Sequence, residues 1–158
     1  FRRRHSEAYL QKHPEERGKD AATTRAACEK YALVPTSVMN FLEGTRFTVS
    51  KQQRQNSPYK HLLKPKVGGF ALALNAMGDK LQSILDITTV YPDGRPDFWD
   101  FTCGKVKRIV VRVRALPVPM ELVNGDYAHD PAVREAYQKW VQQLWTEKDA
   151  QIEALLSR

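Results

Sequence analysis

The chain has 158 residues and a net charge of +7, which is enough sequence for one domain with its own core. Its 42% hydrophobic content excludes a disordered tail, and its two cysteines cannot build a disulfide framework. No stretch approaches the ~18 consecutive apolar residues of a membrane span. Residues 1–66 hold 14 basic and 6 acidic side chains, so the positive charge gathers there. Such a one-sided field predicts an anionic partner: phosphate, nucleic acid or a membrane surface.

The first third of the chain contains one predicted helix and one predicted strand. Residues 21–31 lack Gly and Pro, and Asp20 is a suitable N-cap, so a helix is expected there. Residues 36–42 are β-branched and apolar, which is typical of a short buried strand. Residues 47–66 are polar, basic and without periodicity, which predicts a long loop of the kind that often carries function.

Helices and strands alternate in the rest of the chain. Phe70, Leu74 and Met77 share a helical face that ends at Gly78. Strands are predicted over 84–91 and 107–116, the second with a half-exposed, edge-like pattern.

A final helix is expected to begin at Asp130-Pro131, with Asp as the cap and Pro in the first turn. This order predicts an α/β fold with a partly parallel sheet flanked by helices. We expect residues 1–120 to form the main domain and residues 121–158 to form a helical extension that packs on it.

The end of the first predicted strand carries the sharpest motif, Phe41 to Arg46 (FLEGTR). It delivers Glu43, Gly44, Thr45 and Arg46 to the carboxyl end of a strand, where α/β sheets bind ligands. Gly44 would allow a sharp turn, and Arg46 could bind a phosphate in a bidentate fork. An ordinary turn with a solvated arginine explains the pattern equally well.

Two further basic segments could bind anions. Lys64 and Lys66 precede Gly68-Gly69 at a predicted helix start, where unpaired N–H groups attract anions. A solvated basic loop is the simpler interpretation. The run Arg2 to Arg4 is the densest cluster of charge, and a solvated terminus explains it. No Walker or dinucleotide glycine pattern is present.

The remaining chemistry-bearing residues suggest structural roles. No His or Cys pair has zinc spacing, and neither a metal nor a cofactor is predicted. Cys28 and Cys103 are expected to be buried thiols. The tryptophans are expected in the core or at interfaces: Trp99, Trp140 and Trp145.

The motif from Phe41 to Arg46 resembles the Phe-Pro-Glu-Gly-Thr-Arg signature of the glycerolipid acyltransferase family, the 1-acylglycerol-3-phosphate acyltransferases. Leu42 replaces the commoner proline. The segments 57–69 and 87–92 and the arginine run also look like family blocks. The set is similar to a membrane-bound bacterial branch related to lysocardiolipin and lysophosphatidylinositol acyltransferases.

The family's catalytic block, a His followed five residues later by Asp, has no match in this sequence. We therefore expect the chain to be the C-terminal part of the domain, with the dyad and a membrane segment ahead of Phe1, and to be inactive alone. The four His residues are followed at that spacing by Leu10, Gly18, Lys66 and Arg134.

The resemblance implies acyl transfer from acyl-CoA, or from acyl carrier protein, to the free hydroxyl of a lysophospholipid such as 1-acylglycerol-3-phosphate. It implies residence at the cytoplasmic face of a bacterial inner membrane and no nucleic-acid partner. The residues it assigns to the acceptor are Arg4, Glu43, Gly44, Thr45, Arg46, Lys66 and Gly69.

Two alternatives from other classes remain open at this point. One is a nucleic-acid-binding module, motivated by the basic N-terminal region, although no recognition element is apparent. The other is a non-catalytic module that binds anionic lipid through its basic patch.

Overall fold

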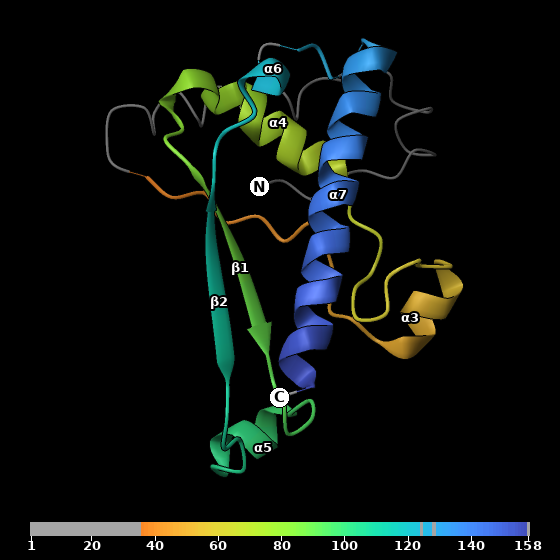
Figure 1. The fold of residues 1–158 in the computed structure, drawn as a ribbon, viewed down its shortest axis with the longest axis vertical. Helices are drawn as coiled ribbons and strands as arrows, with labels where there is room; N and C mark the ends of the chain where they lie inside the picture. The colour runs from red at the N-terminus through yellow and green to blue at the C-terminus, as the bar shows by residue number, and fades with distance from the viewer. Residues whose placement is uncertain (1–35, 124, 128, 158) are drawn as a thin grey trace, which may run out of the picture.

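The computed structural model describes residues 36–123, 125–127 and 129–157. The helix predicted over 21–31, the run Arg2 to Arg4 and Cys28 lie outside the described residues. A long C-terminal helix runs alongside a two-stranded hairpin, and shorter helices lie at both ends of this pair (Figure 1).

The long helix is α7, Pro131–Leu156, and it begins where the sequence predicts. Asp130 is its N-cap, and the carboxylate accepts hydrogen bonds from the backbone N–H groups of Ala132 and Val133. One face of the helix is apolar and packs into the core. Its buried residues are Tyr137, Val141, Leu144, Trp145 and Leu155.

The hairpin consists of β1, Ile84–Val90, and β2, Val110–Leu116. The strands pair antiparallel from Ile84 opposite Leu116 to Val90 opposite Val110. The expectation of a partly parallel sheet is therefore not met within the described residues, although the mixture of helices and strands is compatible with an α/β class. The connection between β1 and β2 contains only the short α5, Phe98–Thr102, which lies at the end of the hairpin. The chain therefore re-enters the sheet at the end where β1 left it, and β2 runs antiparallel to β1.

A helical cluster lies at the other end of the hairpin. The predicted helix at Phe70 to Met77 is confirmed as α4, Val67–Met77, which ends at Gly78, where the positive φ of 54° favours glycine. A short 3₁₀ turn, η2 (Gly78–Lys80), follows, and α6 (Met120–Val123) packs on α4 and α7. The division at residue 120 remains a prediction. The buried cluster here consists of Ala71, Leu74, Leu122, Val123 and Tyr137.

Two predictions for residues 36–66 are wrong. Residues 36–42 form no strand, and Met39 and Phe41 are 74% and 76% exposed, because no described strand lies beside them to pair with their backbone. The predicted loop contains a helix, α3 (Val49–Arg54), whose N-cap is Thr48.

One smaller prediction also needs correction. Cys103 is exposed, because it follows α5 at the outer end of the hairpin. Trp145 is buried and Trp140 half-buried, as a core role requires, whereas Trp99 is 70% exposed, so for Trp99 the core alternative is excluded and the interface alternative stays a prediction.

Candidate acceptor pocket

The centre of the candidate site is a tight turn formed by the FLEGTR motif. The N–H of Gly44 donates a 2.9 Å hydrogen bond to the carbonyl of Phe41. Gly44 has a φ of +66°, a left-handed conformation that glycine adopts without the steric cost of a side chain. The backbone conformation of the turn therefore accounts for a glycine at this position of the motif. We call residues 43–46 the Glu43–Arg46 turn.

Helix α3 holds this turn from one side. The ammonium group of Lys51 donates to the hydroxyl of Thr45 at 2.8 Å and to the carbonyl of Arg46 at 3.1 Å. Thr48 accepts from the Lys51 N–H at 3.3 Å and thereby starts the helix that carries this lysine. The hydroxyl of Thr45 is thus occupied by a contact within the protein.

The segment 57–66 lies beside the turn. The N–H of Lys66 donates a 2.7 Å hydrogen bond to the carbonyl of Leu42, and the Lys66 side chain passes over Gly44. A Cβ atom at Gly44 would lie 3.4 Å from the Lys66 ammonium nitrogen. The structure therefore brings Lys66 to the Glu43–Arg46 turn.

Helix α7 fixes this segment in place. The carboxylate of Asp149 accepts from the N–H groups of Lys60 and His61 at 2.8 and 2.7 Å. Glu153 pairs with the side chains of the same two residues at 2.7 and 2.5 Å. The segment beside the turn is therefore positioned by a helix far away in the sequence.

A pocket of about 490 Å³ opens at the Glu43–Arg46 turn, and all four residues of the turn line it. Its apolar wall comes from the core beneath, where Leu62 and Trp145 are buried with Tyr59, Val141 and Leu144. Apolar walls with a few polar groups are typical of small-molecule sites. The other lining residues are Asn40, Phe41, Leu42, Leu62, Ile87, Trp145 and Lys148.

Glu43 is the acidic residue that lines the pocket. Burial raises the pKa of its carboxyl above the ordinary value of 4.5, because desolvation disfavours the charged form. A hydrogen bond with the Leu63 backbone and the positive charges of Lys148 and Arg95 oppose that rise in the pKa. The half-buried carboxyl is thus linked to Leu63, whose side chain is fully buried.

Lys148 is held at the pocket by a buried ion-pair network. Asp86 on β1 is 8% exposed and contacts both the Lys148 ammonium group and the guanidinium of Arg114 on β2. Arg114 contacts Asp86 at 2.8 and 3.1 Å, and Lys148 also donates to the carbonyl of Ile87 at 3.0 Å. The network ties α7 to the hairpin and fixes one cation in the pocket wall.

Arg46 offers a second cation. It is exposed, lines the pocket, and its guanidinium makes no ion pair within the described part of the chain. A guanidinium that is not engaged within the protein can bind an anionic group through two parallel hydrogen bonds. The pocket therefore combines an apolar wall with two cations, an arrangement suited to an anion with an apolar tail.

Gly69 lies in the first turn of α4, where an added Cβ would be 3.9 Å from the Asn40 side-chain nitrogen. It is therefore close to a pocket-lining residue. Arg4 lies outside the described residues, so its place in the site stays a prediction.

Sequence reasoning missed Lys148, Trp145 and Lys51. Lys148 leaves a signal in the sequence, because it stands where the apolar stripe of Val141 and Trp145 on α7 calls for another apolar side chain. Within the described residues no group of His, Cys, Asp and Glu side chains forms a metal-binding cluster.

Two curated proteins are similar to this chain. Lysocardiolipin acyltransferase 1 of Danio rerio is 24% identical over 129 residues, which cover 75% of this chain and 31% of that protein. An uncharacterised acyltransferase of Schizosaccharomyces pombe is 26% identical over 138 residues, which cover 76% of this chain and 37% of that protein. The chain thus spans about a third of the length of these relatives.

No family model matches the chain, and no solved structure matches it. None of the helices within residues 36–157 that the structure describes is both long enough and apolar enough to cross a bilayer. The comparisons therefore give two distant homologues, both of which are named as acyltransferases.

Proposed function

We propose that this chain provides the acceptor-binding part of an acyltransferase that acylates the free hydroxyl of a lysophospholipid such as 1-acylglycerol-3-phosphate. The observation that carries the proposal is the pocket at the Glu43–Arg46 turn, where Arg46 and Lys148 lie beside an apolar wall. The family resemblance of the turn and the acyltransferase names of the two relatives agree with it.

In this proposal the phosphate of the acceptor binds to Arg46, with Lys66 and Lys148 adding positive charge. A planar guanidinium matches two phosphate oxygens at once, whereas a lysine provides a point charge. The acyl tail of the acceptor lies along Trp145, Leu62 and Ile87, which line the pocket. Glu43 and Gly44 shape the turn that presents these groups.

The chemistry is a direct transfer. The hydroxyl oxygen of the acceptor attacks the thioester carbonyl of acyl-CoA or acyl carrier protein, a C–O bond forms, and the C–S bond breaks. The proton of the hydroxyl passes to a base, and the thiol leaves. Holding the acceptor in place reduces the barrier of such a two-substrate reaction. No His in this sequence is followed five residues later by Asp, so we propose that the isolated chain binds the acceptor without acylating it.

We further propose that the enzyme works at a membrane, because its acceptor is a lipid. From the resemblance we predict that the domain lies at the cytoplasmic face of a bacterial inner membrane.

The test is a titration of the chain with lysophosphatidate whose acyl chain is short enough to keep it monomeric. Arg46→Ala should weaken binding by about tenfold or more, because it removes a charge-assisted bidentate contact. Arg54→Ala, on the exposed face of α3, is the matched control and should leave binding unchanged. Equal binding of a monoacylglycerol, which lacks the phosphate, would contradict phosphate recognition.

A second measurement addresses the chemistry. Incubation of the isolated chain with acyl-CoA and the same acceptor, followed by mass spectrometry of the lipid, should show no diacyl product. Turnover by the isolated chain would contradict the assignment to the acceptor-binding part alone.

A further inference from the structure

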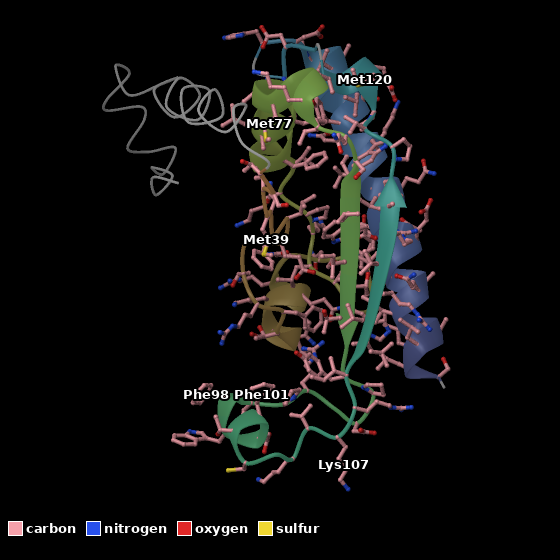
Figure 2. The ribbon with its side chains drawn as sticks, turned by 90° about the vertical axis from the view of Figure 1, so that its left-hand side faces the viewer. Met39, Met77, Phe98, Phe101, Lys107 and Met120 are labelled. Carbon is pink, nitrogen blue, oxygen red and sulfur yellow. The ribbon has the colours of Figure 1, made fainter. Side chains whose placement is uncertain are left out.

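The outer end of the β1–β2 hairpin exposes aromatic surface that the acceptor pocket does not use. Phe98, Trp99 and Phe101 on α5 are 72%, 70% and 63% exposed. Figure 2 shows Phe98 and Phe101 at one end of the molecule, with Lys107 on the segment that returns to β2. Three large aromatic side chains so close together form an apolar patch of the kind that marks an interaction site. We call residues 93–108 the hairpin tip.

The hairpin tip is locally ordered. Asp97 accepts from the Asp100 N–H at 2.7 Å, and Asp100 accepts from the Asp97 N–H at 3.2 Å, which completes a capping box. Asp100 also pairs with Lys105 at 3.2 Å. Asp97 and Asp100 thus form their hydrogen bonds and ion pair within the hairpin tip. The aromatic residues lie on a helix whose N-terminus is capped.

Basic side chains gather beside the aromatic patch. A hollow of about 220 Å³ in the tip is lined by four of them together with Asp93 and Asp100. Lys107 and Arg108 make no ion pair within the described part of the chain. The surface next to the aromatic residues is therefore complementary to negative charge. The four basic residues are Arg95, Lys105, Lys107 and Arg108.

We propose that the hairpin tip is a bilayer anchor, which inserts Phe98, Trp99 and Phe101 at the headgroup level of an anionic membrane. Trp favours this region because its ring is apolar and its indole N–H can remain hydrated, and Phe side chains add buried apolar area at the acyl boundary. Lys107 and Arg108 lie where they can bind lipid phosphates, and basic residues near an anionic surface add attraction. The choice of a bilayer as the partner rests on the proposed function, in which the acceptor is a lipid.

The decisive test is position-specific. The full chain is mixed with phosphatidylcholine–phosphatidylglycerol vesicles whose lipids carry bromine near the top of the acyl chain. Trp99 fluorescence should be quenched, and Trp99→Phe should abolish this quenching, because Trp145 is buried and Trp140 half-buried. Equal quenching in Trp99→Phe would overturn the proposal.

A sedimentation assay with the same lipids, without bromine, measures the contribution of the tip to binding. The triple variant Phe98→Ser, Trp99→Ser, Phe101→Ser should bind about tenfold more weakly or worse, because it loses the inserted apolar area. The matched control changes Leu85 and Val113 to Thr, two exposed residues on the sheet face at 59% and 58%. Far-UV circular dichroism verifies that both variants are folded. Loss of binding in the control and not in the triple variant would overturn the proposal.

The charge contribution is tested with Lys107→Glu, Arg108→Glu, which should reduce the preference for vesicles that contain phosphatidylglycerol over pure phosphatidylcholine. Titration with monomeric lysophosphatidate separates this proposal from the proposed function. A tip variant that keeps lysophosphatidate affinity and loses vesicle binding supports the anchor. Vesicle binding that is independent of the tip overturns the anchor and leaves the pocket proposal standing.

Discussion

The indole N–H of Trp145 donates a 3.0 Å hydrogen bond to the backbone carbonyl of Leu63, and both side chains are buried. This bond joins α7 to the segment beside the Glu43–Arg46 turn. We expect Trp145→Phe to lower the free energy of unfolding by about 1–3 kcal/mol, because the Leu63 carbonyl is left buried without its donor. Urea denaturation of the purified chain measures this difference.

Trp99→Phe is the matched control for that substitution. Trp99 is exposed, so the same change there should alter the free energy of unfolding by less than about 0.5 kcal/mol. Similar losses for both variants would show that the Trp145–Leu63 bond contributes nothing specific.

Gly44 provides a second prediction, about the backbone of the turn. An alanine at a φ of +66° costs about 1–2 kcal/mol, and its Cβ would also meet the Lys66 side chain at 3.4 Å. Gly104 has a nearly equal φ of +68° with open space around it. Gly104→Ala therefore measures how much the positive φ alone lowers the free energy of unfolding. We expect Gly44→Ala to weaken lysophosphatidate binding, and Gly104→Ala to leave it intact. Binding that is equal in both variants would contradict the role of the turn.

The network around Asp86 gives a third prediction. Asp86→Ala leaves Lys148 and Arg114 without their shared buried carboxylate, so we expect a loss of about 2–4 kcal/mol in thermal or urea unfolding. Glu147 is the more exposed partner of Arg114, at 3.0 Å, and Glu147→Ala should cost less than about 1 kcal/mol. The reverse order of the two losses would refute this account.

Glu43 makes stability depend on pH. Burial raises the pKa of Glu43 in the folded chain above 4.5, so ionisation of Glu43 opposes folding. The contribution of Glu43 to the stability of the folded chain is therefore most favourable below pH 4.5. The contribution is lost as the pH rises through the raised pKa. Glu43→Gln cannot ionise, so its stability relative to the wild type should increase from pH 4 to neutral pH. A constant difference across this range would argue against a raised pKa.

Lys148 provides an independent check on the same carboxyl. Its positive charge lowers the pKa of Glu43, so Lys148→Met should raise that pKa further. Carbon-13 NMR of the Glu43 carboxyl follows the titration directly. A fall in the Glu43 pKa would contradict the electrostatic account of the pocket.

The helices with strong local signals are the part of the fold that the sequence predicts well. Asp130-Pro131 and the periodic apolar residues that follow act within one or two turns, so α7 begins where expected. The same holds for α4, whose end at Gly78 is set by the glycine itself.

Predictions that depend on distant parts of the chain failed for a physical reason. An apolar run such as 36–42 becomes a strand only when it pairs with another strand, and the two described strands, β1 and β2, pair only with each other. Helix α3 has no buried residue and hence no apolar stripe to reveal it. Of the site, the turn and Lys66 could be identified from the sequence. Lys148 could be noticed only as a charged residue on the apolar stripe of α7, because its place at the pocket depends on where α7 lies.

The contacts between α7 and the pocket segment also bear on how the protein is made. The bonds from Leu63 to Trp145 and from Lys60 to Asp149 span 82 and 89 residues of sequence. At roughly 5–20 residues per second, the ribosome needs about 4–18 s to synthesise that interval. Throughout this time the apolar side chains of Tyr59 and Leu62 have no helix to cover them. The apolar wall of the pocket therefore stays without its helical cover until synthesis reaches α7.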